Sequence, residues 1–259
     1  MTSKVQVDHS YYARPKYGTM ERFITYHHQI AAIRDAGVKS VLLVGVGDGL
    51  VPYYLEEVLG ISVTTCDIDL DLKPDIVGDI KNLPCEDNAY DAVAVFEVLE
   101  HLPYEDFNTC VCEIARVSRR KAFISIPYRN TGVDLLFKFP FIRTLINRDW
   151  LRLRCTVPIK FPGFVVSGQH YWEISTQTSK RMVHRDVEQY FKIKKKEHVV
   201  FDAYRYVMSL EKKDGMSNEY AKDYYDNYLK DLPGDYKSER WFKTAAHEFD
   251  YNQTKKVIN

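Results

Sequence analysis

Three glycines at alternate positions follow a short apolar stretch and form the most chemically informative part of the chain. Residues 41–44 are all apolar, and Gly45, Gly47 and Gly49 come directly after them. A short run without polar residues is typical of a parallel strand that is buried on both faces. Glycine can adopt positive φ and has no side chain, so a flat ligand can lie against the main chain here. The spacing predicts a ligand-binding turn that leads into a helix over 51–59.

The spacing of these glycines, and of the acids after them, narrows the choice of ligand. The dinucleotide-binding fingerprint is Gly-x-Gly-x-x-Gly, and its last glycine would fall where this chain has Leu50. An NAD-dependent oxidoreductase is therefore disfavoured. A second strand, 61–67, ends in Asp67, about twenty residues beyond the glycines, where a carboxylate can accept hydrogen bonds from both hydroxyls of a ribose. Asp69 and Asp71 are alternatives for the same role.

Two further motifs come next along the chain. Residues 78–84 read Gly-Asp-Ile-Lys-Asn-Leu-Pro, and a buried strand over 90–96 is followed by Glu-Val-Leu-Glu-His at 97–101. Together with Gly-x-Gly-x-Gly, these motifs resemble those of the class I methyltransferases that use S-adenosylmethionine (SAM), in particular the small-molecule branch often called type 11. The resemblance implies an α/β, Rossmann-like fold: a seven-stranded, mostly parallel sheet with helices on both faces, an antiparallel last strand and an inserted cap.

The resemblance also implies which residues bind SAM. The glycine turn would support the methionine and ribose portions, the acid after the second strand would bind the ribose, and the acid of the third motif would reach the adenine amino group. The implied cofactor residues are Gly45, Gly47, Gly49, Asp67, Asp79, Ile80 and Glu97. One position departs from the family pattern, because Leu43 stands where an acid is usual. We therefore expect the methionine end to be held differently.

The composition sets limits on the function. The 259 residues are 45% hydrophobic, enough for one α/β domain with an embellishment. Lys and Arg balance Asp and Glu at 36 each, which removes the electrostatic case for nucleic-acid binding. No apolar run reaches the ~18 residues of a membrane span, so we expect a cytoplasmic protein without a membrane partner. Five cysteines without zinc-like spacing predict reduced thiols and no metal site.

The remaining pattern divides the chain into a domain and an extension. We expect a methyltransferase domain over 1–211 and a charged, Tyr-rich helical extension over 212–259. A stripe of tyrosines in the extension favours docking on its own domain or on a second subunit of a homodimer. Within the domain, helices are predicted over 20–36, 105–118 and 181–191, a strand over 121–127, and a closing antiparallel hairpin around 199–210.

The segment 131–180 interrupts the alternation of strands and helices and is aromatic and basic. The family commonly builds its acceptor pocket in such an insertion, so we interpret it as a cap over the acceptor; a solvated basic face is the alternative. Guanidinium groups pair bidentately with anions, which predicts an anionic acceptor. A second aromatic segment near the N-terminus would form a lid or, alternatively, an unstructured terminus. The predicted acceptor-binding residues are Tyr11, Tyr12, Arg14, Arg129, Arg143, Arg152, Tyr171 and Trp172.

Two histidines are candidates for removing a proton from the acceptor. His170 lies in a His-Tyr-Trp-Glu stretch that looks like part of methyltransferases acting on sugars or other small precursors, and His101 ends the fourth motif. Either imidazole could act as general base. The alternatives are a packing role for His170 and support of the loop by His101.

The function predicted from the sequence is SAM-dependent O-methylation of a small acidic, phosphorylated or sugar-type metabolite or glycan precursor. Methylation of a protein or another macromolecule stays open, because the same donor site would serve it. A non-catalytic SAM-binding protein is the third interpretation, since Leu43 breaks the donor pattern. The chain lacks the Asn/Asp-Pro-Pro-Tyr/Phe motif of amino methylation, which argues against methylation of nucleic-acid bases.

Overall fold

The structure is a computed structural model that describes residues 11–12, 14, 17–139, 141–146, 151–157, 169–176, 178–202 and 204–214. These residues all belong to one compact unit, residues 1–216. The predicted Tyr-rich extension, apart from its first three residues, lies outside the described residues. Its predicted helix and its proposed part in a homodimer therefore stay predictions.

A seven-stranded sheet forms the centre of the domain, in the order β3-β2-β1-β4-β5-β9-β8. The first five strands along the chain pair in parallel, and β9 pairs antiparallel with both of its neighbours. This confirms the predicted mostly parallel sheet with an antiparallel last strand. The strands are β1 Ser40–Val44, β2 Ser62–Asp67, β3 Ile76–Val77, β4 Tyr90–Phe96, β5 Ser118–Pro127, β8 Phe191–His198 and β9 Arg205–Lys212.

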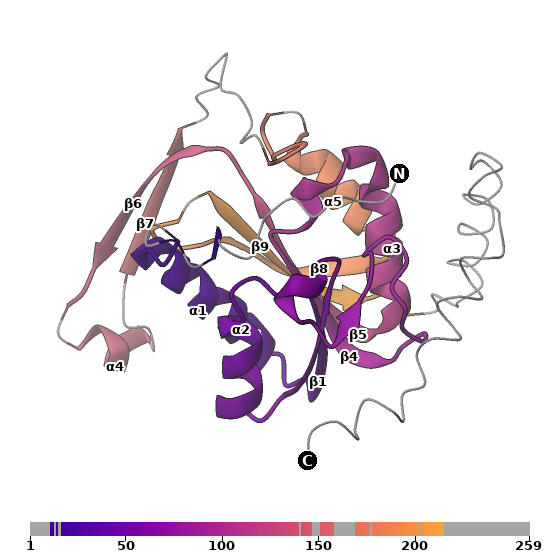
Figure 1. Cartoon of the computed structure of the whole chain (residues 1–259). Coiled ribbons are helices and arrows are strands. Elements are labelled where there is room, and N and C mark those ends of the chain that lie inside the picture. The colour runs from indigo at the N-terminus through magenta and orange to yellow at the C-terminus, as the bar shows by residue number, and fades with distance from the viewer. Residues whose placement is uncertain are drawn as a thin grey trace, which may run out of the picture. The chain divides into compact units, whose positions relative to one another are not determined.

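Helices cover both faces of the sheet (Figure 1). On one face lie α1 (Met20–Arg34) and α2 (Leu50–Tyr53), and on the other lie α3 (Phe107–Val117) and α5 (Lys180–Val187). Successive residues of a strand point to opposite faces, so a strand between two helical layers must be apolar throughout. In β1, Val41 and Leu43 are buried in one core cluster with Ile33 of α1 and Leu55. Leu42 is also fully buried.

The predicted helix over 20–36 begins where predicted but ends earlier, at Arg34, and the other helix boundaries also shift. Thr19 caps α1, accepting a hydrogen bond from the Arg22 main-chain N–H. The predicted helix over 51–59 begins one residue earlier and continues as a single π-helical segment, Tyr54–Val58. The predicted helix over 181–191 ends at Val187, because Phe191 already pairs with Lys212 as the first residue of β8.

The inserted segment forms a β-hairpin outside the main sheet (Figure 1). Its strands are β6 (Thr131–Phe137) and β7 (Leu151–Val157), with the short helix α4 (Ile142–Ile146) between them. Arg152 ties the hairpin to the domain, because its Nη1 donates a hydrogen bond of 3.0 Å to the main-chain oxygen of His198. That this hairpin covers the acceptor stays a prediction.

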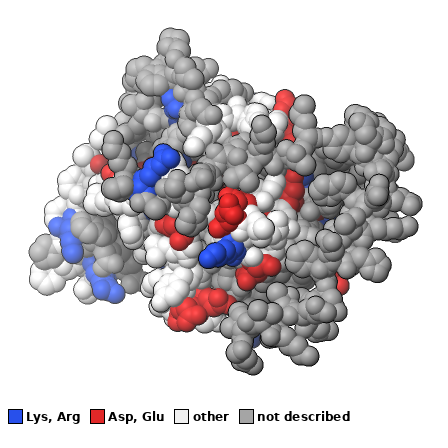
Figure 2. Space-filling view, viewed as in Figure 1, with Lys and Arg blue, Asp and Glu red and all other residues white. Residues whose placement is uncertain are grey.

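The surface carries both signs of charge. On the face drawn in Figure 2, acidic side chains lie mainly over the centre, and several basic ones lie toward the hairpin and α4. Among the described residues, no helix has the length and apolar character that crossing a membrane requires. The predicted cytoplasmic location goes further than this finding and stays a prediction.

Candidate active site

The glycine turn is held open by its hydrogen bonds and by its backbone geometry. Gly45 continues the β1–β2 pairing, donating a hydrogen bond of 2.8 Å to the Cys66 carbonyl. Its φ is +90°, and a Cβ at this position would lie 2.5 Å from Cγ2 of Val98. Any other residue would therefore be strained and would also clash. Gly49, with a φ of +79°, caps the start of α2.

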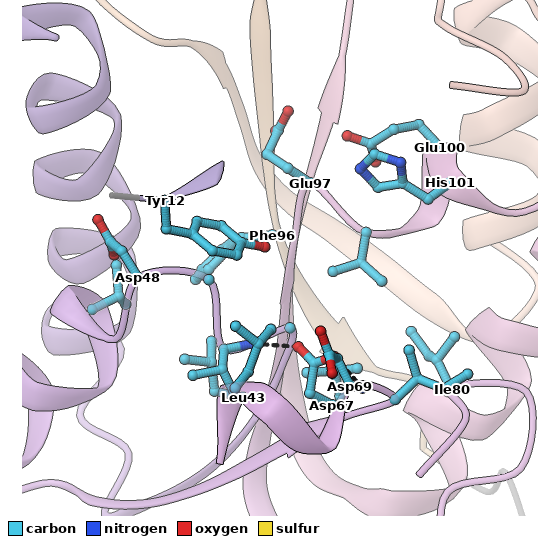
Figure 3. Close-up of a pocket in the computed structure, with 18 of the residues that line it drawn as sticks. Tyr12, Leu43, Asp48, Asp67, Asp69, Ile80, Phe96, Glu97, Glu100 and His101 are labelled. Carbon is cyan, nitrogen blue, oxygen red and sulfur yellow. Dashed lines mark hydrogen bonds between the residues drawn. The ribbon is translucent and has the colours of Figure 1, made fainter. Parts of the chain in front are cut away.

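A cavity opens at the carboxyl ends of β1, β2 and β4, where a parallel α/β sheet binds its ligands (Figure 3). Six of the seven predicted cofactor residues line it; Gly49 does not, since it serves the helix start instead. The structure therefore brings the predicted motifs together in one place. The six residues are Gly45, Gly47, Asp67, Asp79, Ile80 and Glu97.

Asp67 connects the two strands that flank this cavity. Its Oδ2 accepts a hydrogen bond of 2.9 Å from the Val46 main-chain N–H, and its Oδ1 accepts one of 3.0 Å from that of Asp69. A carboxylate has about four lone-pair positions, so both oxygens can still accept from ribose hydroxyls. On the far side of the cavity Ile80 is buried and supplies an apolar surface, next to the carboxylate of Asp79.

The position that departs from the family pattern is apolar for a structural reason. Leu43 is 2% exposed and belongs to the core cluster that also contains Tyr26 of α1. The cavity is also lined by two charged residues that were not predicted from the sequence, Asp48 and Arg22. Asp48 accepts a hydrogen bond of 2.7 Å from the Tyr26 hydroxyl. Arg22 makes no ion pair with any described residue; its Nη1 donates to the Tyr17 hydroxyl at 3.1 Å.

An aromatic cluster covers the same end of the cavity. Tyr11, Tyr12 and Tyr17 pack edge to face, with ring centroids 5.1 to 5.9 Å apart, and all three line the cavity. Tyr12 points inward in Figure 3. Burial, together with the neighbouring Tyr17 and Asp67, raises the pKa of Tyr12, which therefore keeps its hydroxyl proton for donation. Arg14 lies over the Tyr11 ring, is exposed and does not line the cavity.

Glu97 closes the end of β4 in an uncommon conformation. Its φ is +57°, which is rare for a residue with a side chain. The Ser125 hydroxyl donates a hydrogen bond of 2.7 Å to its Oε1, and Arg205 of β9 forms an ion pair with its Oε2. Arg205 is another cavity residue that sequence reasoning missed. Its contribution could not be foreseen, because β9 reaches this place only through the antiparallel closure of the sheet.

The two candidate histidines face one another in the same cavity. The His101 and His170 rings lie 5.1 Å apart, although 68 residues separate them along the chain. Three hydrogen bonds fix the segment that carries His170: Tyr171 N–H to the Glu100 carbonyl at 2.8 Å, Trp172 Nε1–H to the Leu102 carbonyl at 3.0 Å, and Ile174 N–H to the Pro127 carbonyl at 3.0 Å.

The Glu173 carboxylate binds three side chains and orients His170; we call it the Glu173 hub. Its Oε1 lies 3.0 Å from His170 Nδ1 and also accepts from the Tyr204 hydroxyl, while its Oε2 accepts from Arg129 Nε at 2.9 Å. Burial opposes ionisation of Glu173, but these three donors together lower its pKa to about 2. The carboxylate is therefore charged at neutral pH and holds a hydrogen on His170 Nδ1.

Besides Arg14, five more of the predicted acceptor-binding residues do not line the cavity. Trp172 is 1% exposed and packs against Tyr104 and Phe107, while Tyr171 is exposed. The guanidinium groups of two arginines already bind carboxylates. Arg129 pairs with Glu173, and Arg152 pairs bidentately with Asp134. Arg143 is exposed on α4. Their predicted contact with the acceptor stays a prediction without support from this cavity.

The fold and site define a class. Residues 42–126, from β1 to β5, match a family described as "Methyltransferase domain", and they contain every predicted cofactor residue. This part of the chain is similar to a methyltransferase domain, and the sheet has the strand order of the class I methyltransferase fold.

Solved structures share the fold at low sequence identity. The PH0226 protein from Pyrococcus horikoshii OT3 is 18% identical, with a TM-score of 0.51 over 80% of this chain and 100% of its own. The magnesium protoporphyrin IX methyltransferase of Synechocystis PCC 6803, solved with bound SAM, is 15% identical, with a TM-score of 0.50 over 79% of this chain and 91% of its own. Among curated protein sequences no match is found.

Proposed function

We propose that the domain transfers the methyl group of SAM to an oxygen atom of a small acceptor that carries an acidic, phosphate or sugar group. The observation that supports this most is the His101–His170 pair, which lines the same cavity as the glycine turn and Asp67. A hydroxyl must lose its proton when it is methylated, and an imidazole pair beside the methyl donor suits that step.

We propose that the two ends of SAM lie at the two ends of the cavity. Adenosine lies between Asp67 and Ile80, with the ribose hydroxyls on the carboxylate. The methionine end lies toward Asp48 and Arg22, whose opposite charges match its ammonium and carboxylate groups. Between them, the sulfonium and its methyl group lie toward Glu97 and the histidine pair.

Methyl transfer is an in-line displacement in which a sulfonium becomes a neutral thioether. The enzyme must hold donor and acceptor in line and exclude water, and such positioning can lower the barrier by roughly 7 to 11 kcal/mol. A general base contributes less, typically about 10²- to 10⁴-fold in rate. The tyrosine cluster over the cavity supports the exclusion of water.

A buried guanidinium on the cap supports an anionic acceptor. Arg154 of β7 donates to Asn130 Oδ1 at 2.9 Å through Nη2, and its Nη1 lies 3.9 Å from Oδ2 of Asp134. Its buried Nε and Nη1 have no hydrogen-bond partner among the described residues. Asn130 follows β5, whose carboxyl end borders the crevice between strands β4 and β5. We place the acid or phosphate group of the acceptor at Arg154.

Labelling tests this function. The full chain is incubated with SAM carrying a deuterated methyl group and with a metabolite extract of its host, and labelled products are identified by mass spectrometry. The proposal expects label in a small acidic, phosphorylated or sugar-type molecule through an oxygen atom. Label found only in protein or nucleic acid would contradict it, as would SAM binding without any product.

Charge variants then test the acceptor class. With the identified acceptor, Arg154→Gln should raise KM by about tenfold or more, because a charge-assisted hydrogen bond contributes roughly 1.5 to 3 kcal/mol. Arg181→Gln, at an exposed position of α5, is the matched control and should leave KM unchanged. An unchanged KM for Arg154→Gln would contradict the anion-binding part alone.

A further inference from the structure

Glu100 is a buried carboxyl group for which no described residue provides a hydrogen-bond donor. It is 0% exposed, and within the described part of the chain neither Oε1 nor Oε2 has a hydrogen-bond partner. It lies beside His101 and near Glu97 (Figure 3). The nearby guanidinium of Arg205 pairs with other carboxylates: it forms an ion pair with Glu97, and its Nε lies 3.6 Å from Oδ2 of Asp202. A buried carboxylate needs a compensating group, so either a proton or a cation must accompany Glu100.

The two histidines converge on this carboxylate. One ligand-type atom from each of Glu100, His101 and His170 lies within 4.8 Å of the other two. A metal ion with bonds of about 2.1 Å holds its ligand atoms roughly 3 to 4 Å apart, so small side-chain rotations would suffice. All three residues line the cavity in which SAM is placed.

Hydrogen bonds set the tautomers of both rings. The Gln169 carbonyl, 2.8 Å from His101 Nδ1, can only accept, and the Glu173 carboxylate does the same at His170 Nδ1. Each Nδ1 therefore carries hydrogen, and in the neutral ring the lone pair lies on Nε2. A metal-binding histidine usually donates its other ring hydrogen in this way to a carbonyl or a carboxylate.

We propose that Glu100, His101 and His170 bind a divalent transition-metal ion next to the methyl donor. The donor set decides the kind of ion, because imidazole nitrogen with carboxylate oxygen suits Mn²⁺, Fe²⁺, Co²⁺ or Zn²⁺, whereas Mg²⁺ and Ca²⁺ prefer oxygen alone. Sequence spacing could not indicate this site, since it joins adjacent positions to a residue of the insertion.

The site gives the histidines a role in methyl transfer, and this role, unlike the binding itself, rests on the proposed function. An ion with three protein ligands keeps positions open for an acceptor oxygen and lowers the pKa of a hydroxyl bound there. Both histidines would then act as ligands in place of a general base, and the hydroxyl bound to the ion would release its proton to solvent water before it attacks the methyl group. Glu173 is a positioning residue in this arrangement, because it acts only through His170.

The test measures binding of Co²⁺ to the full-length chain after treatment with a chelator, without SAM or acceptor. We expect one equivalent to bind, with visible absorption bands, and Mn²⁺ or Zn²⁺ to displace it. Glu100→Gln and His170→Gln should each weaken binding by about 100-fold or more. Glu173→Gln should weaken it by about 10- to 100-fold while leaving one equivalent bound.

The matched control is His27→Gln, which removes an exposed imidazole from α1 and should bind Co²⁺ like the parent chain. Thermal unfolding of each variant without metal shows whether it is folded. Failure of the parent chain to bind Co²⁺ would overturn the proposal and would mean that a proton accompanies Glu100. The proposal would also be overturned if the variants at Glu100 and His170 bound Co²⁺ like the parent chain. Neither outcome affects the labelling test, so the two proposals fail separately.

Discussion

His170 Nδ1 lies 3.0 Å from Oε1 of Glu173, and Arg129 and Tyr204 hold the same carboxylate. This arrangement fixes the direction of one imidazole in the cavity. It also joins the segment that carries His170 to the end of β5 and to the start of β9, so the geometry of the site depends on the ionised state of one buried acid.

The Glu173 hub predicts a pH dependence of stability. Burial opposes and three donors favour its ionisation, with a net fall in pKa from 4.5 to about 2. A lowered pKa means that its stabilisation is complete above about pH 4.5 and is lost as the pH falls toward 2. Between pH 5 and 3, the Tm of the parent chain should fall more steeply than that of Glu173→Gln. Parallel curves in calorimetry would show that the hub does not stabilise the fold.

The first glycine of the turn should not tolerate alanine. Gly45→Ala combines a φ of +90° with a Cβ 2.5 Å from Val98, and overpacking of this kind costs about 1 to 3 kcal/mol beyond the backbone strain. Gly60→Ala is the control, because its φ is +66° but nothing lies within 4 Å of its Cβ. Urea unfolding should show a larger loss for Gly45→Ala; equal losses would exclude the clash.

Substitutions at Asp48 and Arg22 should weaken binding of the methionine end of SAM but not of its adenosine end. Asp48→Asn and Arg22→Gln are each expected to weaken SAM binding by about tenfold, the loss of one charge-assisted hydrogen bond. Neither should change the affinity for adenosine, which lacks the methionine portion. Calorimetric titration with both ligands checks this. A parallel loss of adenosine affinity would place these residues elsewhere than at the methionine end.

Trp172 should matter for stability rather than for acceptor binding. It is 1% exposed between Tyr104 and Phe107, so Trp172→Ala should lower the free energy of unfolding by about 3 to 5 kcal/mol. Trp172→Phe keeps an aromatic ring in the same core and should lose less. An acceptor KM that rises in Trp172→Phe without a loss of stability would instead favour the role predicted from the sequence.

The sequence predicted the structure best where a hydrophobic strand pattern is followed directly by residues that can bind a ligand. The apolar stretch of β1, the glycine turn and the acid at the end of β2 are neighbours in sequence and in space, because consecutive parallel strands bring their carboxyl ends to one edge. Hydrophobic pattern therefore predicted individual strands, while the resemblance to the class I methyltransferases implied the arrangement of the sheet and the residues at the donor end of the cavity.

The other half of the cavity depends on contacts that no local pattern records. Arg205 reaches Glu97 only because β9 inserts beside β5, and His170 meets His101 only because its segment bonds back to residues 100 and 102. For the same reason the sequence does not show which cap arginines already have a carboxylate partner, and their contact with the acceptor stays a prediction. The type of Arg152 suggested an anion site, whereas its partner Asp134 was hidden in a hairpin register that the sequence does not specify.

The central claim is that SAM binds at the glycine turn with its ribose on Asp67. Titration calorimetry of the parent chain and of Asp67→Asn with SAM tests it most directly, since the substitution keeps the size of the side chain but removes its charge. We predict a loss of about 10- to 100-fold in affinity for Asp67→Asn, for SAM and adenosine alike. An unchanged affinity for SAM would contradict the account.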